Sequence, residues 1–324
     1  MDASRKKLRV AALSVLSNGA LVAGKIVVGT LTGSVSVLSE AIHSGIDLLA
    51  SLIALIAVRT SGKPADPEHP WGHEKVENLS GAIEAVLIFV AAIWIIYESV
   101  DKLLHPMPLN AVGLGIGIMA LSSAVNIAVS RALFRVGKET DSVALVADAW
   151  HLRTDVYTSL GVMAGLGIIT LGGIFLPKVD LTWLDPAIAI CVAVLIMKAA
   201  FRLTRQSIAD LLDTSMPENE RVWITSFLRH EIREACGFHR LRTRKAGATR
   251  FVEFHLLVEP DMHVDDSHAI TDRITAEMRE RFPGCNVTIH IEPCDGSCKD
   301  ACVAGCLVAA DEREARSSKF RSGH

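Results

Sequence analysis

Long apolar segments separated by short polar ones fill the first two thirds of the chain. Shorter segments follow, in which apolar and polar residues are interspersed. A helix needs about 20 predominantly apolar residues to cross the roughly 30 Å hydrocarbon core of a bilayer. The apolar segments satisfy that requirement and predict six transmembrane helices, at residues 8–29, 35–59, 79–100, 111–134, 143–170 and 184–203.

Basic residues gather on one side of these predicted helices, and only Lys102 and Lys178 flank the other side. Because Lys and Arg are enriched in cytoplasmic loops, both termini are predicted to be cytoplasmic, which requires an even number of spans. The first apolar run follows basic residues and has no small-residue cleavage signature. We therefore interpret it as a retained helix and not as a removed signal peptide.

Two of the predicted spans carry ionisable side chains near their middle. His43 and Asp47 are four residues apart in the second span, and His151 and Asp155 repeat this spacing in the fifth. Four residues is about one helical turn, so each pair leaves a single helix face. At about 1.5 Å per residue, antiparallel spans would place Asp47 level with His151 and His43 level with Asp155. Ionisable groups at this depth are costly and by default indicate a functional site.

Two imidazoles and two carboxylates suit Zn²⁺ in a tetrahedral shell, whereas Mg²⁺ and Ca²⁺ prefer oxygen ligands alone. The alternative is a set of polar groups that only joins two helices. Arg153 points to the opposite helix face and has no predicted partner. Other polar residues of the spans are interpreted as snorkelling groups or interhelical hydrogen bonds, and these are Asn18, Lys25, Glu84 and Asn126.

A second candidate metal site lies in the loop between the second and third spans. Asp66, His69 and His73 fall within eight residues of one another, which is typical of an exposed metal site. Solvated loop residues are the alternative interpretation, because three prolines shape the same segment.

After residue 205 the pattern predicts a small α+β domain with an open-faced sheet. A helix is expected at 216–235, strands at 237–244 and 249–258, a helix capped by Asp265 or Asp266, and a last strand at 286–291. Five potential metal ligands are spread over this domain, with surface histidines as the alternative: His239, His255, His268, His290 and Glu292.

Composition narrows the classes of function that remain possible. The net charge of −3 and the lack of basic runs with interleaved aromatic residues argue against nucleic acid as a partner. Four of the seven cysteines lie in a tail that is predicted to be irregular or loosely helical, which is not a secreted disulfide framework. On a helix their spacing of four would align the thiols for soft metals, against the alternative of a disordered or redox-reactive tail. These are Cys294, Cys298, Cys302 and Cys306.

Together these motifs resemble the cation diffusion facilitators, a family of proton-coupled divalent-metal exporters. The landmarks match in order as far as about residue 293: SEAIHSGID, PADPEHPWGHEKVE, DAWHLRTD, LLDTSMP, FHRLRTRKAGATRFVEFHLLV and FPGCNVTIHIEPC. The two His-x3-Asp pairs are similar to the zinc-preferring subset. Co²⁺, Cd²⁺ and Fe²⁺ are the alternative substrates, because affinity order alone does not fix the physiological metal.

The resemblance implies a role for each group of ligands. It assigns transport to His43, Asp47, His151 and Asp155, and a loop site to Asp66, His69 and His73. It assigns a binuclear site at a dimer interface to His239, His255, His268, His290 and Glu292, although relatives often have aspartate at the last position. It also implies a salt bridge between Lys75 and Asp213 that links the membrane and cytoplasmic parts.

The resemblance further implies a homodimer in the inner cell membrane, with Zn²⁺ as cargo and as a structural or regulatory ion. The expected parts are a transport domain at 1–207, a ferredoxin-like cytoplasmic domain at 208–293 and a cysteine-containing tail at 294–324. Inward proton flow would drive alternating access, because metal and protons compete for the same ligands. The weaker alternatives are a membrane-anchored metal sensor and a metalloenzyme, and the latter would need an open coordination position. We therefore expect a transporter and no catalytic residues.

Overall fold

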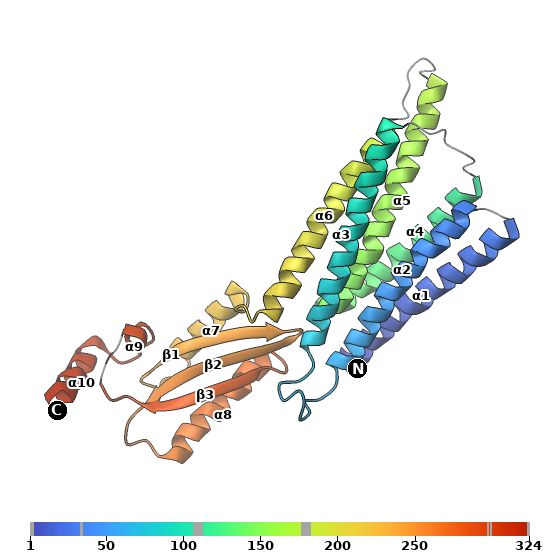
Figure 1. Ribbon diagram of the computed structural model, residues 1–324. Helices are drawn as coiled ribbons and strands as arrows, with labels where there is room; N and C mark the ends of the chain where they lie inside the picture. The colour runs from blue at the N-terminus through green and yellow to red at the C-terminus, as the bar shows by residue number, and fades with distance from the viewer. Residues whose placement is uncertain are drawn as a thin grey trace. The chain divides into compact units, whose positions relative to one another are not determined.

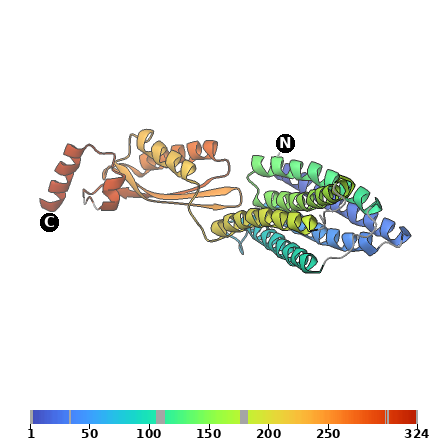
Figure 2. The same ribbon diagram turned by 90° about the horizontal axis from the view of Figure 1, so that it is seen from above.

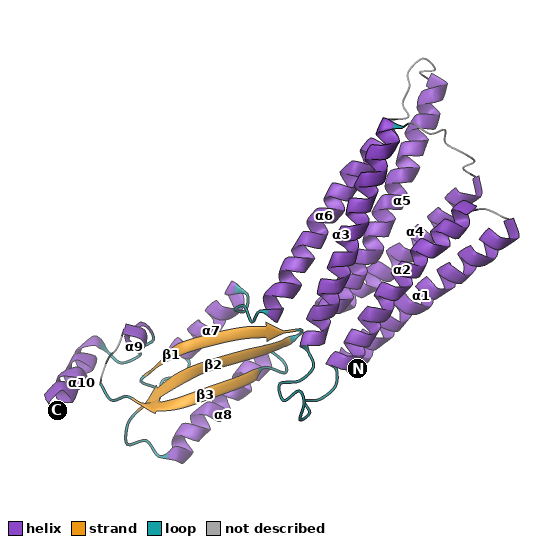
Figure 3. Cartoon of the chain, viewed as in Figure 1, coloured by secondary structure: helices purple, strands orange, loops and turns teal. Residues whose placement is uncertain are grey.

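The computed structural model describes residues 3–32, 35–105, 113–175, 183–296, 298 and 300–322. They form two compact units, which divide after Leu211. The first unit is helical, and the second combines a small sheet with helices (Figure 3).

The helices of the first unit follow the predicted apolar segments. They are α1 (Ala3–Thr32), α2 (Val35–Ser61), α3 (Lys75–Leu104), α4 (Gly113–Glu139), α5 (Val143–Phe175) and α6 (Leu184–Leu211) (Figure 1). Among the described residues, four segments are long and apolar enough to cross a bilayer: Ala3–Leu31, Ser44–Ser61, Lys75–Leu104 and Pro186–Leu211. The six predicted helices are therefore confirmed as helices. Four of them contain a described segment that is long and apolar enough to span a bilayer, so six transmembrane spans stay a prediction.

Helix α5 occupies the centre of the packing in this unit. It contacts α2, α3, α4 and α6. One side of α5 joins a buried cluster with α1, α2 and α4 that contains Ala57, Leu133 and Leu152. Another side places Ala147 in a cluster with α3 and α6. Small residues at these contacts let the backbones approach closely, which brings α5 against α2.

The second unit confirms the predicted order of helix, two strands, helix and strand. Its elements are α7 (Glu218–His230), β1 (Gly237–Ala246), β2 (Thr249–Val258), α8 (Val264–Arg281) and β3 (Asn286–Pro293). The sheet order is β1-β2-β3, with β1 antiparallel and β3 parallel to β2. The predicted aspartate cap of α8 is wrong: His263 is the N-cap residue, and Asp265 and Asp266 lie in the first helical turn.

Helices α7 and α8 cover the same face of the sheet (Figure 2). Their apolar side chains, such as Ile224 of α7 and Ile274 of α8, pack with Phe254 and Leu256 of β2 into one buried core. Because side chains alternate along a strand, His255 between those two residues points to the opposite face. Neither α7 nor α8 contributes to that face, which carries Glu253 and His255 of β2.

The tail after β3 is more ordered than the sequence predicts. It contains α9 (Asp300–Ala304) and α10 (Ala310–Ser322). The alignment of the tail cysteines that a single helix would give is not observed, because the five-residue α9 contains only Cys302 of the four. Gly305 follows directly after this helix.

Candidate metal centres

The contact between α2 and α5 brings three of the four predicted transport ligands together. Asp47 and His151 are buried, and the His151 Nε2 atom lies 3.2 Å from the Asp47 Oδ1 atom. One ligand atom each from Asp47, His151 and Asp155 lies within 4.8 Å of the other two. The predicted level pairing of Asp47 with His151 is therefore present. His43 lies on α2 one turn before Asp47, but its side chain is outside the described part of the structure.

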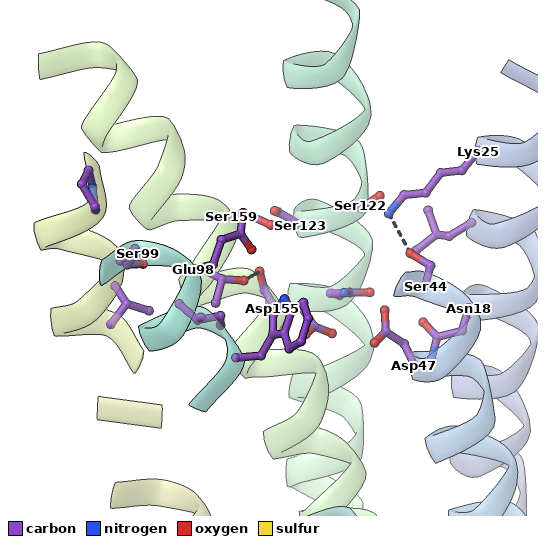
Figure 4. Close-up of a pocket in the computed structure, with 18 of the residues that line it drawn as sticks. Asn18, Lys25, Ser44, Asp47, Glu98, Ser99, Ser122, Ser123, Asp155 and Ser159 are labelled. Carbon is purple, nitrogen blue, oxygen red and sulfur yellow. Dashed lines mark hydrogen bonds between the residues drawn. The ribbon is translucent and has the colours of Figure 1, made fainter. Parts of the chain in front are cut away.

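A cavity of about 370 Å³ reaches this group. Asp47 from α2 and Asp155 from α5 both extend into it (Figure 4). Its lining continues to Glu98 and Lys102 near the end of α3, so the cavity extends from the ligand group toward that end of the helix bundle. Hydroxyl and amide side chains make much of the wall polar, and these include Asn18, Ser44, Ser122, Ser123, Asn126, Thr158 and Ser159.

Polar side chains between the helices confirm two of the predicted interhelical hydrogen bonds. Lys25 donates to the Ser44 hydroxyl at 2.7 Å, and Asn18 donates to Ser51 at 2.6 Å. Ser51 in turn donates to Asp148 at 3.1 Å. Asp148 is fully buried one turn before His151, and we did not single it out from the sequence. The three-residue spacing between Asp148 and His151 puts both side chains on one face of α5, so the sequence could have identified Asp148 as a neighbour of the ligands.

Arg153 has a described neighbour that the sequence did not predict. Its guanidinium lies over the Phe134 ring, 5.5 Å from the ring centroid. Arginine on an aromatic face is a favourable cation–π contact. Arg153 therefore joins α5 to α4 and leaves the opposite face of α5 to His151.

The loop residues Asp66, His69 and His73 form a second compact group of ligands. Asp66 uses one oxygen for each ring: Oδ1 lies 3.2 Å from the His69 Nδ1 atom, and Oδ2 lies 3.2 Å from the His73 Nε2 atom. The backbone N–H of His69 donates to Asp66 and lowers the pKa of this carboxyl, with further lowering by the two rings. The carboxylate is thus held ionised between two imidazoles, as a metal site requires.

The strand register builds the third group. His239 pairs with His255, and His255 pairs with His290, so one histidine from each strand lies in a row across the sheet. Glu292 is two residues beyond His290 on the same face. Its oxygens lie 2.9 Å from His239 Nε2 and 2.8 Å from His255 Nδ1. Burial raises the pKa of Glu292, but the hydrogen bonds from His255 and His239 outweigh it and lower the pKa below its usual value.

Not every predicted ligand joins this group. His239, His255 and Glu292 have ligand atoms within 4.8 Å of one another, and His290 lies beside them with its Nε2 atom 3.6 Å from Glu292. His268 is exposed on α8 and lies 3.6 Å from Asp272. The described geometry therefore groups His239, His255 and Glu292 as one site with His290 beside it, and leaves His268 outside this group.

The predicted link between Lys75 and Asp213 joins the two units and stays a prediction. Within its own unit, Lys75 donates to the Leu211 carbonyl at 3.4 Å. Asp213, with a positive φ of 56°, pairs with Arg244 at 3.3 Å in the second unit.

Side chains that could bind a metal ion, buried between apolar helices, together with a separate α+β unit that carries a similar group, are typical of a membrane protein that handles metal ions. The chain matches the cation efflux transmembrane domain over residues 11–212 and the cation efflux protein cytoplasmic domain over residues 216–294. The protein therefore belongs to the cation efflux family, also called cation diffusion facilitators, whose members are transporters and not enzymes.

Curated relatives match over most of their length. An uncharacterized transporter of Synechocystis is 39% identical over 284 residues, which cover 86% of this chain and 89% of that protein. The cation-efflux pump FieF of Salmonella newport is 32% identical over 288 residues, with 88% and 92% covered. A solved structure titled as the zinc form of the putative zinc transporter CzrB is 40% identical, with 26% of this chain and 96% of that chain covered and a TM-score of 0.25.

Proposed function

We propose that the protein exports divalent metal ions from the cytoplasm, with Zn²⁺ as the favoured substrate, in exchange for protons. The observation that carries this proposal is the group of Asp47, His151 and Asp155 at the cavity between α2 and α5. Imidazole and carboxylate are ligands that suit Zn²⁺, and His43 would complete a tetrahedral shell. Such a shell leaves no open position for a reacting water molecule, which favours transport over metalloenzyme chemistry.

Proton coupling follows from the chemistry of the same side chains. The His151 Nε2 and Asp47 Oδ1 atoms lie 3.2 Å apart, within hydrogen-bond distance, and an ion can bind only when both groups are deprotonated and face the metal. An acidic outer compartment would protonate the ligands and release the ion. Return of the empty site to the cytoplasm would then deliver protons, as alternating access requires.

We further propose that all six helices of the first unit cross the inner cell membrane, with both termini in the cytoplasm. Support comes from the basic residues gathered on one side of the predicted spans. The cavity lining includes Lys102, one of the few basic residues on the other side, so the described state would be open to the outside.

The second unit would form a ferredoxin-like cytoplasmic dimerisation domain in a homodimer. Its histidine row and Glu292 support a regulatory metal site at that interface, with His268 as a further ligand implied by family resemblance. The Asp66 loop would hold a third metal site, and Lys75 with Asp213 would link the two parts. The match to a protein named cation-efflux pump supports metal export without specifying the ion, so Co²⁺, Cd²⁺ and Fe²⁺ are the alternative cargoes.

Zinc uptake into proteoliposomes tests the proposal. We expect vesicles with an acidic lumen to accumulate Zn²⁺, and Asp47→Asn or Asp155→Asn to reduce the initial rate by about 100-fold or more. Loss of a direct ligand should exceed the 10–100-fold effect typical of outer-shell partners. A panel of divalent ions under the same gradient would rank the alternative cargoes.

Glu98→Gln is the matched control for this experiment. Glu98 lines the same cavity but is exposed and pairs with Lys102 at 3.0 Å, outside the ligand group. Its rate should stay within about twofold of the original protein, because an exposed pair contributes little. Zinc uptake that survives both aspartate substitutions would contradict the proposed site, and uptake indifferent to the pH gradient would contradict proton coupling alone.

A further inference from the structure

A buried lysine lies in the wall of the cavity that reaches the candidate transport ligands. Lys25 of α1 is only 5% exposed, although an ammonium group is costly to bury among apolar side chains. Its Nζ atom donates to the buried Ser44 hydroxyl of α2 at 2.7 Å, so the ammonium end points between the helices and does not snorkel. An ionisable group that stays buried among apolar helices of this length is by default a functional candidate.

Ser44 places this ammonium group close to a candidate metal ligand. Ser44 precedes Asp47 by three residues on α2, so the two side chains leave one helix face about 4.5 Å apart along the helix axis. Lys25, Ser44 and Asp47 line the same cavity, and Figure 4 shows Lys25 reaching Ser44 with Asp47 next along α2. Lys25 therefore contacts α2 within one helical turn of the ligand group.

Lys25 lies on the side of the ligands toward which the cavity extends. Ser44 is nearer than Asp47 to the start of α2, and α2 starts at the end of the bundle where α3 ends (Figure 1). The cavity lining at that end includes Glu98 and Lys102. An ion that leaves the ligands through this cavity therefore passes the Lys25 ammonium group.

The charges that face the cavity differ in how well solvent screens them. The described lining contains three carboxylates, Asp47, Glu98 and Asp155, and two ammonium groups, Lys25 and Lys102. Glu98 and Lys102 form an exposed pair at 3.0 Å, which solvent screens. Lys25 and Asp47 are both buried, so the field of the Lys25 ammonium acts on the ligand group with much less screening.

We propose that Lys25 is a tethered cation that lowers the affinity of the transport site for the divalent ion and so promotes its release into the cavity. This inference rests on the proposed transport function of Asp47, His151 and Asp155. A fixed positive charge repels a bound dication, and after the ion has left it stabilises the carboxylates that remain. Lys25 is thus not a metal ligand but a residue that sets how tightly the ligands hold the ion.

Zinc binding by Lys25 variants of the full-length protein tests this role. Methionine has a side chain of similar length without the charge, so Lys25→Met should tighten zinc binding at the transport site by about tenfold or more. Because the loop and the second unit could also bind zinc, transport-site binding is measured as the part that is lost when Asp155→Asn is added to the same variant. Lys25→Gln, which keeps an N–H donor for Ser44, should give the same gain as Lys25→Met.

Transport by the same variants separates an effect on release from a structural effect. In proteoliposomes, Lys25→Met should lower both the KM for Zn²⁺ and the maximal rate, because the ion is held more tightly and leaves more slowly. A merely structural role of the Lys25–Ser44 hydrogen bond predicts weaker binding instead. Misfolding also removes binding, so it cannot produce the expected gain.

Lys25→Arg and Lys102→Met are the matched controls. Arginine keeps the positive charge, so Lys25→Arg should bind zinc within about threefold of the original protein. Lys102→Met removes an ammonium group from the same cavity, but from the exposed pair with Glu98, and should change the affinity by less than about twofold.

The outcomes distinguish this inference from the proposed function. If Asp155→Asn removes zinc binding but neither Lys25→Met nor Lys25→Gln tightens it, the role of Lys25 is overturned and the transport site stands. Equal tightening in Lys25→Arg also overturns the role, because the charge is then not the cause. If Asp155→Asn removes no zinc binding from any variant, the proposed transport site fails, and this inference fails with it.

Discussion

In both ligand groups outside the apolar helices, one carboxylate lies between two imidazoles. Asp66 contacts His69 and His73 with different oxygens, and Glu292 does the same with His239 and His255. The hydrogen bonds fix the rings before any ion arrives, which lowers the entropy lost on metal binding. A bound ion would replace those hydrogen bonds with coordination by the same atoms. Loss of the carboxylate charge should therefore harm metal binding more than loss of a nearby exposed charge.

At residue scale we expect Asp66→Asn to abolish Zn²⁺-dependent protection of the 62–74 loop in hydrogen–deuterium exchange. Glu68→Gln is the control, because only the Glu68 backbone N–H contacts Asp66. The pKa of Asp66 is lowered from 3.8, chiefly by the His69 backbone N–H. The charge-dependent ordering should therefore be fully present above that value and disappear as the pH falls through the lower folded-state pKa. Equal protection in both variants would contradict a loop site.

At the scale of elements, Glu77 joins the ends of several helices. This buried carboxylate of α3 accepts hydrogen bonds from Lys7 of α1 and Ser61 of α2, each at 2.8 Å. It also accepts one from Ser142, the residue before α5. Four parts of the chain therefore meet at one charge. Removing that charge would leave the partly buried Lys7 ammonium without its carboxylate partner.

We expect Glu77→Gln to destabilise the first unit by about 3–5 kcal/mol, the range for breaking a buried ion pair. Glu139→Gln is the control, since Glu139 forms an exposed pair with Lys6 at 3.7 Å and should contribute at most about 1 kcal/mol. Thermal unfolding of the purified protein in one detergent would compare the two. Equal unfolding temperatures would show that the Glu77 contacts contribute no more than a surface pair.

The sequence predicted elements and ligands where the signal is local or periodic. Apolar runs of bilayer length located the helices, and His-x3-Asp spacing located Asp47 and Asp155 because one helical turn fixes a shared face. Partners that are distant in sequence were missed. Nothing near Glu77 indicates that Lys7 and Ser142 converge on it, and the antiparallel bridge between Gly237 and Cys306 places part of the tail at the edge of β1. Both features arise from tertiary packing, which periodicity does not encode.

For the whole molecule, the important feature is that each unit contains its own candidate metal ligands and its own core. The buried cluster of the second unit draws on α7, the sheet and α8, from Met216 to Cys285, with Leu307 packed against it. No apolar residue of the first unit belongs to that described cluster. A domain with a complete core can fold independently. We therefore infer that metal binding by the cytoplasmic unit can be separated from transport.

We expect a fragment of residues 212–324, with the four tail cysteines replaced by serine, to unfold cooperatively and to gain stability with Zn²⁺. The gain should be about 2.7 kcal/mol when zinc is 100-fold above Kd. Glu292→Gln should remove most of this gain, because it takes away the carboxylate that contacts His239 and His255. His268→Ala distinguishes two ligand sets. The described geometry leaves His268 exposed beside Asp272 and predicts an unchanged gain, whereas the family resemblance makes it a ligand. Loss of the zinc effect in His268→Ala would show that the metal-bound domain recruits α8, and retention would limit the site to the histidine row and Glu292.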